Sequence, residues 1–283
     1  MTASPIRSVR HRRRLRHPSL WLGLLILALV LLPAALSVVW TPYPPGRLDI
    51  LHRLASPSSV HLLGTDPFGR DLLSILMAGA ANSTSVCVAA IAAAFLVGVP
   101  LGLAAASPGW RSAVVMRATD LCLAFPPLLT AAMIVAAKGP GAGGEILAIG
   151  VFNIPAFVRL TRSASLSVLN QDFVAAARIA GRGRVAVLAH HVLPNIVAML
   201  LVQVTLALAV AELSEAGLSY LGLGLPPPLP SLGRALADYQ TRIFDDPLLV
   251  VAPGAVVALL VLGFNLLGDG VRDLLDPTLP HAP

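Results

Sequence analysis

The sequence predicts an all-α membrane protein with six transmembrane helices. The chain of 283 residues is 56% hydrophobic and only 12% charged, whereas a soluble domain carries about 25% charged residues. Several apolar runs reach about 20 residues, the length that a helix needs to cross a bilayer. Strands of a membrane barrel would instead alternate apolar and polar residues. The composition therefore indicates helical spans and excludes an ordinary soluble domain.

The chain starts with a basic segment followed by a long apolar run. Residues 1–18 hold several arginines and no acid, and residues 19–40 are long and apolar enough to span a membrane. A signal peptide begins in the same way, but its hydrophobic region has only about 7–15 residues. We expect an uncleaved first helix, slightly kinked at Pro33, with the basic N-terminus in the cytoplasm. A twin-arginine export signal is the alternative for the arginine run.

Residues 41–82 are mixed in character and are expected to be extracytoplasmic. Residues 64–71, GTDPFGRD, are dense in turn-forming residues. Asp66 is well placed to cap a helix that begins at Pro67. We expect a structural turn followed by a helix that lies on the membrane.

Residues 83–268 are expected to form a core of five helices. In the second span, Gly98 and Gly102 are one turn apart, a spacing that permits close helix packing. The third span, 113–136, contains Asp120, which we expect to pair with Arg117 one turn earlier. A double proline also interrupts it, and neighbouring helices or a water-lined cavity must then satisfy the freed carbonyls.

The last three spans are expected near residues 146–160, 196–211 and 248–267. A cytoplasmic loop, 163–195, and an outer loop, 217–247, separate them, and residues 269–283 form a cytoplasmic tail. Six spans with a cytoplasmic N-terminus also place the C-terminus in the cytoplasm. Most arginines then fall on the cytoplasmic side, as the positive-inside rule requires.

Enzyme chemistry has little support in the sequence. The chain has no G-x-x-x-x-G-K-[ST] and only one lysine, Lys138, so it cannot form a P-loop. It also lacks H-E-x-x-H and G-x-S-x-G. Adjacent His190 and His191 would point about 100° apart on a helix and would not converge on one metal ion. The acidic residues of the spans lie mostly near span ends, which disfavours an intramembrane enzyme or an ion-coupled carrier. These residues are Asp120, Glu145, Glu212 and Glu215.

The most patterned polar stretch is residues 170–195, NQDFVAAARIAGRGRVAVLAHHVLPN. Asn170 can cap a short helix whose first turn carries Asp172, which suits the helix dipole. Gly181 is expected to end this helix, and Pro194 to start the next span. One face of the helix would carry Phe173, Ala176, Ala177 and Ala180. An amphipathic interfacial helix is the plain explanation, but small residues around one aromatic also suit a groove on a partner protein.

The segments AAARIAG and HHVLPN resemble the EAA loop of ABC-importer permease subunits. The family pattern is E-A-A, three residues, Gly, and then a run that ends in Leu-Pro. Ala175 stands where the family usually has Glu, and the remaining positions fit: Ala176, Ala177, Gly181, Leu193 and Pro194. Five further segments resemble, in order, the C-type subunit of dipeptide/oligopeptide/nickel permeases: 62–74, 98–105, 116–126, 218–233 and 264–277.

The resemblance implies a type I ABC-importer permease fold in the bacterial cytoplasmic membrane. Such a chain forms half of a translocation pathway for di- and oligopeptides and pairs with a B-type permease. An extracytoplasmic binding protein delivers the substrate, and two cytosolic ATPase subunits, or one fused pair, hold ATP and Mg. This chain itself would hold no cofactor or metal. The residues implied to contact the ATPase are Asp172, Phe173, Ala175, Ala176, Ala177, Arg178, Gly181, Arg182, Arg184 and Pro194.

Alternatives within and outside this family stay open at this point. Nickel or haem is the alternative substrate for the same architecture. An autonomous channel or ion-coupled carrier is the alternative from another class. The lipid bilayer is an expected partner, and nucleic acid is not, because the arginines are not interleaved with the aromatic side chains that stack on bases.

Overall fold

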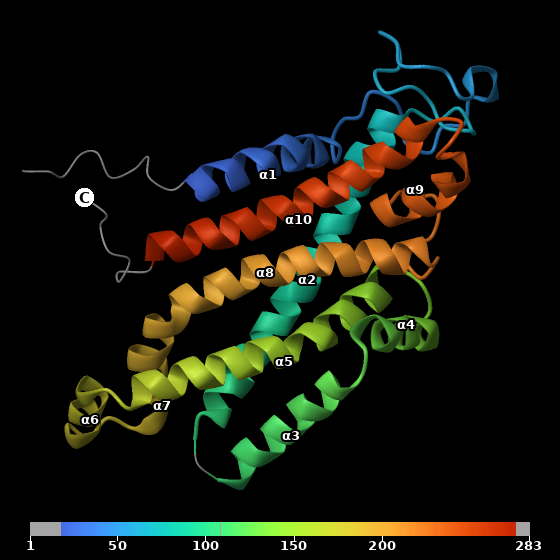
Figure 1. The fold of residues 1–283 in the computed structure, drawn as a ribbon. Helices are drawn as coiled ribbons and strands as arrows, with labels where there is room; N and C mark the ends of the chain where they lie inside the picture. Colours follow the sequence, from blue (N-terminus) through green and yellow to red (C-terminus); the bar gives the residue numbers. More distant parts are fainter. Residues whose placement is uncertain (1–17, 108, 276–283) are drawn as a thin grey trace, which may run out of the picture.

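The computed structural model describes residues 18–275 except residue 108, and this part of the chain is helical, with no strand (Figure 1). The expected all-α fold is confirmed. The α-helices are α1 (Pro18–Leu36), α2 (Leu72–Ala105), α3 (Trp110–Ala124), α4 (Pro127–Lys138), α5 (Ala142–Leu169), α6 (Asp172–Ile179), α7 (Arg184–Val187), α8 (Leu193–Tyr220), α9 (Leu232–Tyr239) and α10 (Pro247–Leu275). Short turns η2 (Ile50–His52), η3 (Leu188–Val192) and η4 (Gln240–Arg242) complete the set.

Within the described residues, five helical stretches are long and apolar enough to cross a membrane: α1, α2, α5, the continuous stretch Arg184–Tyr220, and α10. The sixth expected span is the pair α3 and α4, which passes the same test only if both are taken together, and they meet at a bend of 92°. Phe125 and Pro126 are extended, and Pro127 opens α4. Because proline lacks an N–H and disfavours a helical residue before it, the double proline breaks the helix rather than kinking it.

The glycines of α2 bring it close to α5, as the sequence predicts. A Cβ atom at Gly98 would lie 2.6 Å from Cβ of Phe157, and one at Gly102 would lie 2.5 Å from Cβ of Thr161. Both distances are shorter than real contacts, so only glycine allows the two helices this approach. Phe157 itself is fully buried in the larger apolar cluster of the bundle.

Glycines also join α1 to α10, at positions that the sequence analysis did not single out. A Cβ at Gly23 would lie 2.7 Å from the backbone nitrogen of Leu267, and one at Gly270 would lie 2.5 Å from Cα of Leu20. These contacts lie beside a second apolar cluster that includes Leu27 and Phe264. The first helix is therefore packed onto the last one along its length (Figure 1).

The turn at residues 64–71 does not start a helix at Pro67. The helix begins at Leu72, and Asp71 caps it by accepting a hydrogen bond from the Ser74 backbone N–H at 2.9 Å. Asp66 instead closes the turn, where its Oδ1 accepts the backbone N–H groups of Phe68 and Arg70. The expected cap was thus wrong. Asp66 and Asp71 both fit an N-cap pattern, but an unbroken helical run follows only Asp71.

The expected pair of Asp120 with Arg117 is also wrong. Asp120 Oδ1 lies 2.5 Å from Nη2 of Arg159 on α5, so the ion pair joins α3 to a neighbouring helix. Both side chains are about half exposed. Residue spacing within one helix cannot predict this partner, because Arg159 comes close to Asp120 only when α3 packs against α5.

The bundle has two distinct ends (Figure 1). At one end lie α6 and α7, together with the start of α1 and the end of α10. At the other lie the irregular segment 37–71 and α9. The described ends of the chain therefore share the end of the bundle that carries α6.

Candidate functional site

The short helix α6 projects from one end of the bundle between two long helices, α5 and α8 (Figure 1). It covers Asp172–Ile179, close to the expected bounds. Asn170 is not its cap, because this residue closes α5, and Gln171 precedes α6 without a capping side-chain bond. The expected Asn170 cap was therefore wrong, although Asp172 does lie in the first turn, where its charge suits the helix dipole.

Gly181 ends α6 as expected. Its φ is +80°, in the left-handed region that L-residues avoid. The N–H of Gly181 donates to the carbonyl of Arg178 at 3.0 Å, and the N–H of Arg182 donates to the carbonyl of Ala177 at 3.1 Å. This pair of bonds is the Schellman motif, which turns the chain sharply back toward α7.

The faces of α6 differ in what they contact. Val174 is fully buried and anchors the helix to the bundle, and Ala177 is half-buried. The rest of the predicted contact face is open: Phe173 is 46% exposed, and Ala175, Ala176 and Ala180 are exposed. The helix thus presents small side chains beside one aromatic ring, which is a shape that fits into a groove.

A short loop links α6 to the long helical stretch that follows. The segment from α7 through η3 to α8 forms one helical stretch, Arg184–Tyr220, with a wide π-type turn at Leu188–Val192. There the N–H of Leu193 donates to the carbonyl of Leu188. Pro194 follows at once, and the wide turn accommodates a ring that would otherwise clash with the carbonyl four residues earlier. The expectation that Pro194 starts the span was therefore wrong, because the helical stretch already begins at Arg184 and Pro194 lies inside it, just after the wide turn.

Phe173 also lies near this stretch. Its ring centroid lies 6.3 Å from that of His191 in the wide turn. The neighbouring His190 is exposed and contacts its own helix at the carbonyl of Ala186. His190 thus bonds within its own helix, whereas His191 lies beside the Phe173 ring.

The three arginines of this region are exposed and face the end of α2. Arg178 follows the buried Val174 by one turn, so it shares the inner side of the helix. Together with Arg182 and Arg184 it lines a cavity of about 260 Å³ against Ala106 and Ser107, where α2 ends. Of the residues predicted to contact an ATPase, these three exposed arginines therefore line this cavity, while Phe173 and Ala176 lie on the opposite side of α6 from Arg178.

A polar network at the opposite end of the bundle was missed by sequence reasoning. Arg70 donates from Nε to Asp66 at 2.6 Å, and the buried hydroxyl of Tyr239 donates to the same carboxylate at 2.9 Å. Asp238 lies 4.0 Å from both Arg70 and Arg234. Burial and the Asp66 carboxylate raise the pKa of the Tyr239 hydroxyl, so it stays a donor.

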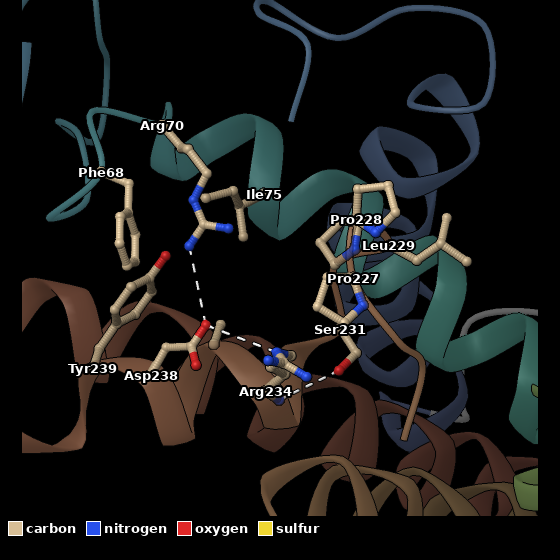
Figure 2. A pocket seen from close by; sticks show the side chains of 12 residues that line it. Phe68, Arg70, Ile75, Pro227, Pro228, Leu229, Ser231, Arg234, Asp238 and Tyr239 are labelled. Carbon is tan, nitrogen blue, oxygen red and sulfur yellow. Dashed lines mark hydrogen bonds and ion pairs between the residues drawn. The ribbon is translucent and has the colours of Figure 1, made fainter. Parts of the chain in front are cut away.

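This network lines a pocket that joins the segment 41–71 to α9 (Figure 2). Prolines 227 and 228 line the pocket, as do the aromatic residues Phe68 and Tyr239. The sequence signals a turn around Asp66, but its partner lies 173 residues away. No local pattern could have identified Tyr239.

Three glutamates that seemed scattered along the spans come together between α5 and α8. Glu145, Glu212 and Glu215 are each at most 1% exposed. The hydroxyl of Ser219 lies 2.8 Å from Oε1 of Glu215 and 3.3 Å from Oε1 of Glu145. Helical spacing predicts that Glu215 and Ser219 meet, but the approach of Glu145 depends on how α5 packs against α8.

The comparisons with known proteins agree with this architecture. Residues 98–280 match the family described as "Binding-protein-dependent transport system inner membrane component". The dipeptide transport system permease protein of Alkalihalophilus pseudofirmus is 39% identical over 258 residues, which cover 91% of this chain and 85% of that protein. The di/tripeptide transport system permease protein of Pseudomonas aeruginosa is 42% identical over 269 residues, 92% of this chain and 89% of that one.

A relative with a different substrate is also similar. The nickel transport system permease protein of Escherichia coli is 36% identical over 262 residues, which cover 92% of this chain and 95% of that protein. The family match covers more than half of this chain, and the relatives align along nearly all of it. The chain is therefore a permease component of the inner membrane, and it belongs to the family of binding-protein-dependent transport system inner membrane components.

Proposed function

We propose that this chain forms half of the translocation pathway of an ATP-driven importer for di- and oligopeptides. A second, B-type permease supplies the other half, and an extracytoplasmic binding protein delivers the peptide. Two cytosolic ATPase subunits, or one fused pair, hold ATP and Mg, and this chain contributes no cofactor. Its basic N-terminus and its C-terminus face the cytoplasm, on the same side as α6.

The observation that carries the proposal is the open face of α6. Phe173 and its neighbouring alanines are exposed, while Val174 and the Gly181 turn hold the helix firmly between α5 and α8. An exposed apolar face on a short, anchored helix indicates a protein partner. Closure of the ATPases would push α6, and α5 and α8 would carry the displacement into the membrane.

Peptides are preferred as the substrate because relatives that are 39% and 42% identical are named for dipeptide and di/tripeptide transport. The nickel permease relative supports the second candidate. Both candidates require the same docking of α6, so they differ only in what the complex imports.

The test is uptake by the complete transporter in proteoliposomes. In the wild type, a labelled dipeptide should be imported with ATP and binding protein present, and Ni²⁺ should not. Phe173→Ala removes the only aromatic of the docking face, and we expect a loss of ATPase binding of about ten-fold or more, because buried aromatic anchors commonly contribute 2 kcal/mol or more. Phe244→Ala is the matched control, since that ring is 96% exposed and lies in the outer loop, away from α6.

Three outcomes would contradict the proposal. Dipeptide transport by this chain alone, without ATPases, would indicate an autonomous carrier or channel. Import of Ni²⁺ in place of dipeptide would make nickel the substrate. Equal ATPase binding in Phe173→Ala and wild type would remove α6 from the interface.

A further inference from the structure

Two adjacent cavities lie on the inner side of α6, between the end of α2, the start of α3 and the segment 178–188. The first, about 260 Å³, is the one lined by Arg178, Arg182 and Arg184. The second, about 450 Å³, extends it past Trp110 and Arg111 at the start of α3. Ser107, Arg184 and Leu188 line both, so the two cavities share a wall.

The charge of these cavities is uniform. Four arginines line them, and no acidic side chain does. In the part of the chain that the structure describes, the guanidinium groups of Arg178, Arg182 and Arg184 form no ion pair or hydrogen bond, and the guanidinium carbon of Arg111 lies 5.7 Å from the centroid of the Trp110 ring. Several uncompensated guanidiniums around one space favour an anion with several oxygens, such as a phosphate group.

The surroundings of the cavities are those of a membrane interface. Trp110 is 73% exposed, and Val114 on the next turn of α3 is also exposed. Val185, on the wall of the second cavity, is 80% exposed. An exposed tryptophan beside basic side chains at the end of a membrane helix is the usual arrangement at the level of the lipid headgroups. A free phosphate ion would leave the adjoining apolar surface exposed to water, whereas the acyl chains of a lipid would cover it.

We infer that these cavities bind the headgroup of an anionic phospholipid, with its phosphate between Arg182 and Arg184 and its acyl chains against Trp110 and Val114. The inference rests on the proposed function, which places this end of the bundle in the cytoplasmic leaflet. An ATPase seated on Phe173, Ala176 and Ala180 would leave the site free, because these residues lie on the opposite side of α6 from Arg178. The lipid would brace the turn between α2 and α3 against the coupling helix.

The test is a lipid titration of the complete transporter, purified in detergent with its partner subunits and followed by native mass spectrometry. The probe is dioleoyl phosphatidylglycerol, and dioleoyl phosphatidylcholine and glycerol 3-phosphate are the comparison ligands. We expect phosphatidylglycerol to be retained more tightly than both. In Arg182→Gln/Arg184→Gln its affinity should fall about 25-fold, the loss that corresponds to about 1 kcal/mol for each basic side chain near an anionic lipid.

The matched control is Arg272→Gln, an exposed arginine in the last turn of α10 that lines neither cavity. It removes one charge at the same end of the bundle and should leave the lipid affinity within about two-fold, because Arg272 lines neither cavity. As a second measurement, brominated phosphatidylglycerol should quench tryptophan fluorescence more than brominated phosphatidylcholine. Trp110→Phe should abolish that difference.

Several results would overturn the inference. One is an unchanged phosphatidylglycerol titration in the double variant. Equal affinity for glycerol 3-phosphate would indicate a free-phosphate site, and loss of the ATPase subunits with normal lipid binding would assign the arginines to a protein contact. The titration contains neither peptide nor ATP, so its failure is distinct from a failure of peptide import.

Discussion

Gly181 and Gly183 lie two positions apart after α6, yet their backbones have different requirements. Gly181 has φ +80°, whereas Gly183 has φ −64°, and an added Cβ would meet open space at both. We expect Gly181→Ala to weaken the α6 turn by about 1 kcal/mol through backbone strain alone, and Gly183→Ala to have no such effect. Hydrogen exchange of residues 172–182 measures the difference, and equal exchange in both variants would contradict it.

At this scale, the sequence predicts what depends on neighbours in the chain. The end of α6 at Gly181 follows from local conformational preference. The partner of Asp120 does not, because Arg159 lies 39 residues away and reaches it only after α3 packs against α5. The link of Asp66 to Tyr239 fails for the same reason. The missing acid at Ala175 is plain from the sequence, and the structure adds that this side chain is exposed.

Among the elements, hydropathy predicts the spans well but not where they end. Helix α2 begins at Leu72, whereas the core was expected to begin at residue 83. The mostly apolar residues 72–82 follow a turn-rich segment, yet they belong to the same helix as the span. The break between α3 and α4 was predicted as an interruption, but its angle of 92° depends on where each half packs. The contact of α1 with α10 joins the first and the last described helices, and no pattern within either helix predicts it.

Two glycines of α10 allow a test of that contact. A Cβ at Gly270 would lie 2.5 Å from Cα of Leu20, whereas one at Gly254 would lie 3.7 Å from a flexible leucine side chain. We expect Gly270→Ala to lower the stability of the chain by about 1–3 kcal/mol through overpacking against backbone, and Gly254→Ala to leave it unchanged or slightly raised. Thermal unfolding in detergent compares the two. Equal midpoints would show that α1 is loosely attached.

The whole molecule connects α6 to the opposite end of the bundle through two antiparallel helices. Helix α5 ends, and the stretch Arg184–Tyr220 begins, beside α6 (Figure 1). At their far ends the same two helices meet again at Glu145, Glu215 and Ser219. Because α5 and α8 are linked near both ends, we expect a displacement of α6 to move these two helices together.

Ser219→Ala opens the far end of this pair without touching α6. Removal of the hydroxyl leaves Oε1 of Glu145 and of Glu215 without their shared partner, at a cost of about 1–3 kcal/mol. We expect ATPase subunits to bind normally to this variant, while dipeptide uptake per ATP hydrolysed falls several-fold, because α8 can then move without α5. Ser214→Ala is the control, since that exposed hydroxyl bonds only to the carbonyl of Val210 in its own helix. If both variants import as much dipeptide per ATP as the wild type, displacement of α6 reaches the pathway by another route than this pair of helices.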